Sequence, residues 1–593
     1  MRPSSCPRSC DAVRVGSALL VAAVAALPAS ALAQARWTEA DTRAVVEATT
    51  TLTLAPDLSR LGPGERTAVR KLLEAGLIFQ ELYEDQNHPD AEWARAGLVE
   101  GSPEALLYRL YRGPIGTNGS NQRVPFLAVR PEMPGKNVYP YDVTRAELDA
   151  WLAAHPQGRD ALLDVRRVVR RATAAQLDFD FAMLGARPGL ALLHPGLEDE
   201  LRALRARPPA GGFYSVPYAL AYAEKLGRVR ALLLEAAAAI APEDADFAAY
   251  LRLRATDLLT STYEGGDAAW VSGSFANLNA QIGSYETYDD ALFGVKAFYS
   301  LSLLARDGER SDELATALTD IQEIENSLPY DRTKRVRSQI PVGVYNVIAD
   351  FGQARGTNTA TILPNDPDHA RKYGRTILLR YNIMTEPTLF AGARGRFCAA
   401  VAERHCAELT MGGNFERTLW HEIGHYLGVD RTVDGRTLDD ALGSLSNLFE
   451  EMKADLVSLF SARALHASGY HTNVELRAVY ASGILRVLQP AAPRRDQPYQ
   501  TMQLMQWNWY LDQGLLALEG GRLVIDYERY HDAVASLLGE VLEIQSAGDL
   551  ARAEAFVDRW GVWSDDVHGG VARAVTSAPG GGIRLVRYQA LDG

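Results

Sequence analysis

The sequence predicts a mainly helical α+β protein with a small β core, and three observations support this fold class. Residues 34–273 carry apolar side chains at the spacing of successive amphipathic helices. Between Ala276 and Ile383 the pattern changes to short alternating runs separated by Gly, Asn, Asp and Pro. Helical spacing returns from Thr418 onward. A chain of 593 residues is long enough for more than one lobe.

The first 33 residues have the pattern of a secretory signal peptide. Three arginines precede an apolar run from Val15 to Leu27, and Ala31-Leu32-Ala33 supplies a small-residue cleavage site. The apolar run is shorter than the roughly 20 residues that a membrane helix needs. We therefore expect export to the periplasm or the medium with no membrane anchor after cleavage; an uncleaved membrane helix is the alternative.

Charge and cysteine content narrow the function classes. The formal net charge is −13 at pH 7, and nothing in the sequence resembles the basic face that binding to nucleic acid requires, so no nucleic-acid partner is expected. Two of the four cysteines lie in the predicted signal peptide, which leaves Cys398 and Cys406. In an oxidising compartment this pair is expected to form a disulfide, and two free thiols remain the alternative.

Two apolar stripes and one break define the helical region that follows the signal peptide. Val69, Leu72, Leu73 and Leu77 form one stripe. A second stripe runs from Val229 to Ile240, and the Pro-Gly-rich stretch at 208–212 predicts a loop between helices.

Two runs in the following region predict strands. Ile282 to Tyr288 alternates as a half-buried strand does, and Ile377 to Tyr381 is a second candidate. Gly356-Thr357-Asn358 and Leu363-Pro364-Asn365-Asp366 are predicted loops.

The pentapeptide His421-Glu422-Ile423-Gly424-His425 carries the strongest chemical signal. Apolar spacing predicts one helix from Thr418 to Val429, which places His421 and His425 one turn apart on one face. Two imidazoles in this arrangement can bind one zinc ion, and Glu422 beside them can accept a proton from a water molecule.

A second acidic segment completes the predicted site. Asn447 and Glu450 have capping-box spacing before a predicted helix from Leu448 to His466. Glu451 and Asp455 lie one turn apart on it, so that Glu451 can be the third zinc ligand while Glu450 and Asp455 stand behind the ligands and orient histidine. The alternative is a buried core histidine with a solvated acidic helix face. Zinc ligation by the cysteines is disfavoured because three protein ligands are already present.

These motifs, taken in order along the chain, resemble the dipeptidyl peptidase III family of zinc exopeptidases, most closely its secreted bacterial branch. The resemblance rests on the zinc pentapeptide, the Glu450-to-Asp455 segment, the Ile282-to-Tyr288 run and the Leu363-to-Asp366 loop, and it covers about Ala276 to Leu516. It implies that Glu286 binds the free amino terminus of a peptide, that Tyr288 donates a hydrogen bond to the developing oxyanion, and that Asn365 contacts the peptide backbone. A carboxylate and a phenol have the chemistry for the first two roles.

The chain departs from the family's pattern at three points. Family members typically have one extra residue within the zinc motif. Ile362 stands where a second asparagine is usual, and no histidine lies between His471 and His531, where the family places a catalytic one. Tyr499 is the alternative hydrogen-bond donor in that stretch.

We therefore predict a two-lobed protein with a cleft, whose zinc site lies on helices of the mainly helical lobe. The predicted divisions are a signal peptide at 1–33, a helical region with part of the β lobe at 34–355, a zinc-binding lobe at 356–520, and C-terminal helices at 521–593 that return to the first lobe. The expected function is release of dipeptides from the amino end of short peptides with one Zn²⁺ ion. A zinc hydrolase with a different amide substrate, or a weak or vestigial binding protein, is the alternative. No signal in the sequence fixes the oligomeric state.

Overall fold

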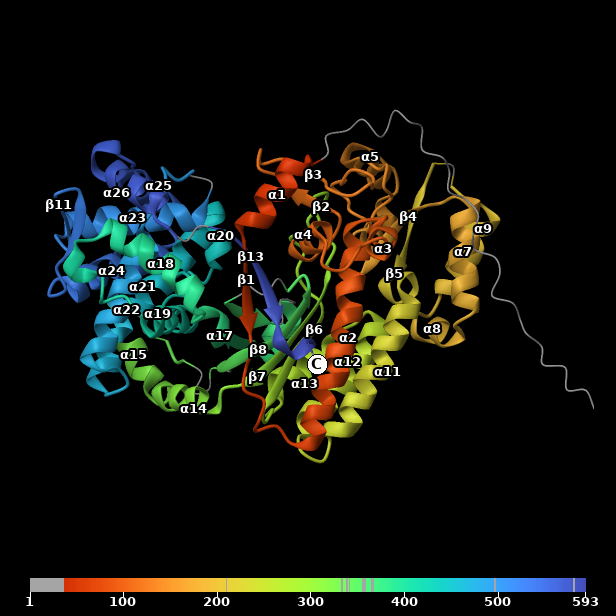
Figure 1. The fold of residues 1–593 in the computed structure, drawn as a ribbon, viewed down its shortest axis with the longest axis horizontal. Helices are drawn as coiled ribbons and strands as arrows, with labels where there is room; N and C mark the ends of the chain where they lie inside the picture. The colour runs from red at the N-terminus through yellow and green to blue at the C-terminus, as the bar shows by residue number, and fades with distance from the viewer. Residues whose placement is uncertain are drawn as a thin grey trace, which may run out of the picture.

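The structure is a computed structural model that describes residues 37–209, 211–331, 334–336, 340, 342–354, 359–363, 367–494, 497–579 and 582–592. The predicted signal peptide and Asn365 lie outside these residues. Helices make up most of the described chain and surround one central sheet (Figure 1). The predicted α+β class with a small β core is confirmed.

The N-terminal part of the chain is built from helices, coloured red to yellow in Figure 1. The longest, α2 (Pro63–Asn87), packs against α11 (Ala223–Ile240) and against strands of the central sheet. Its predicted apolar stripe is buried at Val69, Leu72 and Leu73, whereas Leu77 is 52% exposed. The other helices here are α1 (Glu39–Ala48), α3 (Ala91–Ala96), α4 (Pro103–Tyr111), α5 (Arg145–Ala154), α6 (Arg159–Leu162), α7 (Ala174–Gly185), α8 (Pro188–Leu193), α9 (Leu197–Ala206), α10 (Tyr218–Ala221), α12 (Ala245–Thr260) and α13 (Glu264–Ser272).

Short strand pairs interrupt this helical region, which the periodicity of the sequence did not reveal because each strand has only a few residues. The antiparallel pairs are β2 (Ile115–Thr117) with β3 (Arg123–Pro125) and β4 (Arg167–Arg171) with β5 (Phe213–Pro217). The Pro-Gly-rich stretch after α9 therefore leads into a strand and not into another helix.

The central sheet has five strands in the order β6-β7-β8-β10-β9. Strand β10 pairs with β8 in parallel, and the other neighbours are antiparallel. The strands are β6 (Leu278–Ser284), β7 (Tyr299–Arg306), β8 (Val342–Gly352), β9 (Ala360–Leu363) and β10 (Thr376–Arg380).

Of the two strands predicted from the sequence, one matches the structure and the other ends earlier than predicted. The run from Ile377 to Tyr381 coincides with β10 to within a residue, whereas the run predicted to extend to Tyr288 ends as strand β6 at Ser284. The regular ladder ends there: the Glu286 carbonyl still accepts a hydrogen bond of 3.1 Å from the Phe298 N–H just before β7, and the chain then turns, with the Asp290 N–H donating to the Thr287 carbonyl at 3.0 Å.

A second group of helices, green to blue in Figure 1, lies on the other side of the central sheet from α2 and α11. Its centre is formed by α19 (Met411–Gly424), α21 (Ser446–Ala467) and α22 (Asn473–Val487), which pack on one another. The others are α14 (Gly308–Ala317), α15 (Ile321–Ser327), α16 (Pro367–Tyr373), α17 (Tyr381–Met384), α18 (Pro387–Ala400), α20 (Leu438–Leu442), α23 (Pro498–Asp512), α24 (Tyr530–Ala547), α25 (Leu550–Trp560) and α26 (Gly570–Ser577), with the hairpin β11 (Leu516–Glu519) and β12 (Arg522–Ile525).

Near the end of the chain, strand β13 (Ile583–Tyr588) pairs in parallel with β1 (Thr49–Leu54). The last helices pack differently, because α24 contacts α21, α25 contacts α23 and α26 contacts α18. The return to the N-terminal part is thus made by β13, while α24 to α26 cover the helices of the second group. The predicted divisions at residues 355 and 520 stay predictions.

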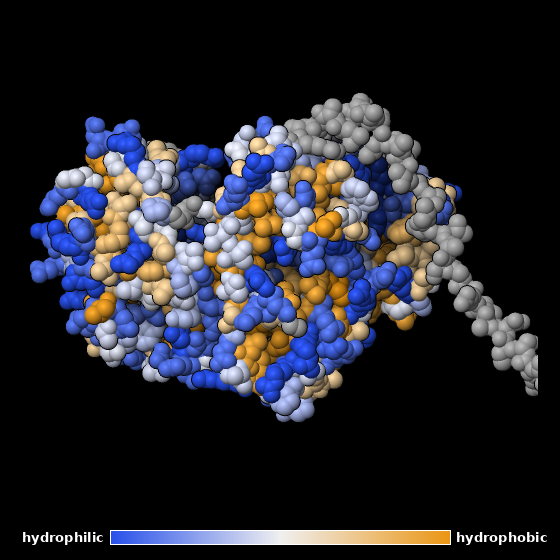
Figure 2. Space-filling view, viewed as in Figure 1, coloured by the Kyte–Doolittle hydropathy of each residue, from blue (hydrophilic) through white to orange (hydrophobic). Residues whose placement is uncertain are grey.

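Surface hydropathy on the face shown in Figure 2 is uneven. Hydrophobic residues gather over the middle of the molecule, around α2, α4 and β13, where a cavity of about 960 Å³ lies. Among the described residues, no helix is both long and apolar enough to cross a membrane.

Two adjacent glycines of α19 test the packing of this helix on α22. A Cβ on Gly413 would lie 2.5 Å from the backbone carbonyl carbon of Ala478, whereas a Cβ on Gly412 would meet nothing closer than the Thr410 hydroxyl oxygen at 3.9 Å. We expect Gly413→Ala to lower the free energy of unfolding by about 1–3 kcal/mol, because backbone must move. Gly412→Ala should raise it by up to about 1 kcal/mol by restricting the unfolded chain.

Urea unfolding of both variants measures the difference. Equal stabilities for the two variants would contradict the close approach of α19 and α22.

Candidate metal centre and active site

Helices α19 and α21 bring the predicted metal ligands together. Helix α19 ends at Gly424, five residues before the predicted end at Val429, and His425 follows as the capping residue with helical φ and ψ of −63° and −23°. His421 and His425 therefore keep their one-turn spacing. A Cβ on Gly424 would lie 2.9 Å from the Ala454 carbonyl oxygen of α21, so glycine permits the close approach of the two helices.

Three ligand atoms converge between these helices. Those of His421, His425 and Glu451 all lie within 4.8 Å of one another. Glu451 Oε2 is 3.4 Å from His421 Nε2 and 4.0 Å from His425 Nε2. Two imidazoles and one carboxylate are a donor set that fits zinc and leaves a coordination position open, so these residues would hold the ion.

Asp455 fixes the ring of His421 from behind. Its Oδ1 lies 2.7 Å from His421 Nδ1, which turns Nε2 toward Glu451. Arg417 and Arg486 also contact the Asp455 carboxylate, at 3.0 and 3.3 Å. Burial opposes charge on the imidazole, but Asp455 outweighs it and raises the pKa of His421 to about 9.

Glu450 contacts the Nδ1 atom of His425, as Asp455 contacts that of His421. Its Oε1 lies 3.0 Å from His425 Nδ1 and accepts a hydrogen bond of 2.8 Å from Lys453 Nζ. Burial opposes charge on Glu450, but Lys453 and His425 lower its pKa to about 2. The capping box predicted for Asn447 and Glu450 is wrong: α21 begins at Ser446, its N-cap residue Leu445 makes no side-chain bond, and Glu450 faces the metal site.

A cavity of about 820 Å³ opens in front of these ligands and reaches the central sheet. Its lining includes the predicted base Glu422 next to His421 and His425, and on the sheet side Gln281, Glu286 and Tyr288. Glu286 and Tyr288 lie in the loop after β6 and not on a strand, and Tyr288 is 83% exposed. Asn365 cannot be placed because it lies outside the described residues.

The same cavity is also lined by Arg417 and Arg486, which the sequence did not single out, and by Tyr499, the alternative hydrogen-bond donor predicted from the sequence. Arg417 precedes His421 by one helical turn, a spacing that could have been noticed. Arg486 of α22 has no local signal, because only packing brings it to the ligands. Packing also brings Tyr499, at the start of α23, to the same place.

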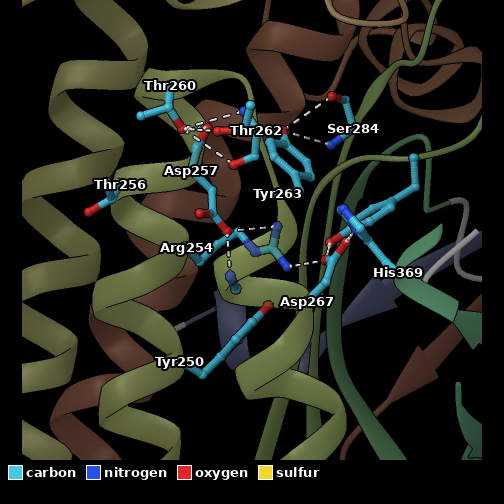
Figure 3. A network of polar contacts seen from close by, with 12 residues as sticks. Tyr250, Arg254, Thr256, Asp257, Thr260, Thr262, Tyr263, Asp267, Ser284 and His369 are labelled. Atoms are coloured by element: carbon cyan, nitrogen blue, oxygen red, sulfur yellow. Dashed lines mark hydrogen bonds and ion pairs between the residues drawn. The ribbon is translucent and has the colours of Figure 1, made fainter. Parts of the chain in front are cut away.

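A network of buried polar groups supports the loop that carries Glu286 (Figure 3). In it, Arg254 of α12 lies 2.7 Å from Asp267 of α13, and the adjacent Tyr285 donates a hydrogen bond of 2.7 Å to the same carboxylate. His369 of α16 lies against the other oxygen of Asp267 at 2.9 Å. Burial opposes the charge on Asp267, but Arg254 prevails and lowers its pKa. One carboxylate thus fixes both the Glu286 loop and α16.

The chain is similar to a known plant protein at low sequence identity. No family model matches the chain. "Nudix hydrolase 3" of Arabidopsis thaliana is 25% identical over 457 residues, which are 75% of this chain, and the chain spans only 56% of that relative.

Two solved structures share the fold. DPP III from Caldithrix abyssi has a TM-score of 0.75 and 24% identity, with 92% of this chain and 98% of that chain covered. Dipeptidyl-peptidase III from Corallococcus sp. strain EGB has a TM-score of 0.68 and 24% identity, with 93% and 97% covered. The α+β class of the fold is therefore specified further: it is the fold of dipeptidyl peptidase III, and the predicted resemblance is confirmed at the level of fold.

Metal affinity tests the ligand set. We expect the wild-type chain to bind one zinc ion, and His421→Ala and His425→Ala to lose it, because each removes one of three ligands. Glu450→Gln should weaken binding about tenfold or more, because the carboxylate that orients His425 loses its charge. Competition with a chelator measures the affinities, and His155→Ala, which removes a histidine stacked on Trp151, is the matched control. Equal affinity in all four variants would contradict the site.

Stability tests the network around Asp267. We expect Asp267→Ala to lower the free energy of unfolding by about 3 kcal/mol or more, because Arg254 is 1% exposed and loses its nearest counter-charge. Asp199→Ala breaks an ion pair with Arg202 whose side chains are 82% and 58% exposed, and should change stability by less than about 1 kcal/mol. Urea unfolding compares the two, and a loss as small for Asp267→Ala as for Asp199→Ala would contradict the network.

Proposed function

We propose that the protein is a zinc-dependent peptidase that releases dipeptides from the amino end of short peptides. The observation that carries the proposal is the convergence of His421, His425 and Glu451 next to Glu422 in a cavity whose opposite wall bears Glu286. The fold shared with dipeptidyl peptidase III structures supports the same function.

The proposed mechanism assigns one role to each side chain. A bound zinc ion would lower the pKa of water and polarise the scissile carbonyl. Glu422 accepts a proton from the attacking water and delivers it to the leaving amine as the carbon–nitrogen bond breaks. Tyr288 donates a hydrogen bond to the carbonyl oxygen as negative charge develops there. Glu286 pairs with the α-ammonium group of the peptide, and Asn365 contacts its backbone.

A second candidate function is hydrolysis of another amide, or of peptides at another spacing, on the same scaffold. The sequence between His471 and His531 contains no histidine, which favours this candidate over dipeptide release. In that case Glu422 still accepts the proton from water, but Glu286 does not bind the amino terminus of a peptide.

We also propose that the protein is exported to an oxidising compartment after cleavage of residues 1–33. The disulfide between Cys398 and Cys406, whose Cα atoms are 4.9 Å apart, supports this location, because such bonds persist where thiols are not kept reduced. Amino-terminal sequencing of the protein recovered from its host tests this proposal. The first residue should be Gln34, and Met1 would contradict the cleavage.

Turnover should depend on Glu422. We expect Glu422→Gln to bind zinc as the wild type does but to lower the rate by about 10²–10⁴-fold, because an amide cannot accept the proton. Mass spectrometry of products, with a chelator competition to confirm bound zinc, provides the measurement. Wild-type turnover in this variant would rule out the assignment.

Products from matched peptides test the dipeptide spacing. Zinc-loaded protein should release dipeptides from four- to eight-residue peptides with free amino termini, and not from their acetylated counterparts, which cannot pair with Glu286. Cleavage at other bonds in both sets would favour the second candidate, and no cleavage would favour a vestigial site.

A further inference from the structure

Each of the three candidate ligands offers a second polar atom, and each of these atoms has a partner. Asp455 lies against Nδ1 of His421, and Glu450 against Nδ1 of His425. The remaining atom is Oε1 of Glu451. It accepts a hydrogen bond of 2.9 Å from the hydroxyl group of Tyr499.

The two oxygens of Glu451 are thereby distinguished. Oε2 is the oxygen that lies 3.4 Å from His421 Nε2 and 4.0 Å from His425 Nε2, where a metal ion would be held. Oε1 faces Tyr499. A carboxylate can bind a metal through one oxygen or through both, and in the second case it takes a coordination position that a catalytic site must keep open.

Packing brings Tyr499 to this oxygen. The residue lies in the first turn of α23, which packs against α21 and α22, and its side chain lines the cavity while remaining 46% exposed. The guanidinium carbon of Arg486 lies 5.9 Å from the centre of its ring, and Arg486 also contacts Asp455. The corner between α22 and α23 therefore supports two of the three ligands, Glu451 directly and His421 through Asp455.

We propose that Tyr499 is a positioning residue that holds Glu451 to metal binding through Oε2 alone and so keeps a coordination position open. The inference rests on the metal site of the proposed function and goes beyond it, because it explains which oxygen binds. Loss of the phenol hydroxyl frees Oε1 to turn toward the ion. Partners of this kind change metal affinity by about 10–100-fold when removed.

The test replaces the hydroxyl group alone. We expect Tyr499→Phe to bind zinc about tenfold or more weakly in competition with a chelator, because the Glu451 carboxylate loses the hydrogen bond that orients it. With cobalt in place of zinc, its visible absorption should be weaker than that of the wild type, because a second carboxylate oxygen raises the coordination number. Tyr373→Phe, which removes a hydroxyl group that donates a hydrogen bond of 2.8 Å to a different glutamate, Glu264, should change neither reading. An unchanged affinity and spectrum for Tyr499→Phe would overturn the proposal.

A double-mutant comparison shows whether Tyr499 acts through Glu451. In a Glu451→Asp background the shorter carboxylate is withdrawn from Tyr499, so adding Tyr499→Phe should weaken zinc binding by much less than tenfold. An equal loss in both backgrounds would overturn the proposal. Melting of the metal-free variants shows whether each still folds.

Neither the zinc affinity nor the cobalt spectrum depends on peptide cleavage. If wild-type protein binds zinc but cuts no peptide, the proposed function fails while the role of Tyr499 is still decided by the phenylalanine variant. If wild-type protein binds neither zinc nor cobalt, both are overturned.

Discussion

One buried carboxylate, that of Asp455, joins the three helices that form the candidate metal centre. It belongs to α21 and contacts His421 and Arg417 of α19 and Arg486 of α22. A buried charge is tolerated only where counter-charges and hydrogen bonds replace water, and here two guanidinium groups do so. Because Asp455 contacts Nδ1 of His421, the imidazole presents its other nitrogen to Glu451. Ligand geometry and helix packing are thus consequences of the same contact.

The opposite wall of the cavity is held in place by a different set of hydrogen bonds. Glu286 and Tyr288 stand in a loop, but the loop is anchored at both ends. Tyr285 bonds to Asp267, and the Asp290 carboxylate accepts the backbone N–H groups of Leu292, Phe293, Val295 and Lys296 at 2.9–3.0 Å. Backbone groups that leave a sheet must find other partners, and a single aspartate supplies them here. Glu286 and Tyr288, to which we assign roles in substrate binding and catalysis only as a proposal, are therefore carried by an irregular segment that the scaffold holds in place.

Much of the fold and the centre of the site could be predicted from the sequence. Helix α21 begins two residues before its predicted range and ends one residue after it, and β10 is shifted by one residue. The ligand spacing of His421 and His425 survives although α19 ends at Gly424, because His425 keeps helical dihedral angles. These features depend on neighbours within one turn, where periodicity is informative.

What the sequence by itself determined is the local chemistry: two histidines one turn apart, Glu422 beside them, and an acidic pair on a later helix. The tertiary structure alone decided the rest. It placed Glu451 against both imidazoles and decided between the two predicted roles of Glu450, giving it the contact with His425 and not the helix cap. It also ended β6 before Glu286 and brought Arg486 and Tyr499 to the ligands. Those outcomes depend on contacts between distant segments, whose geometry is set by packing and by the pairing of buried charges and not by spacing along the chain.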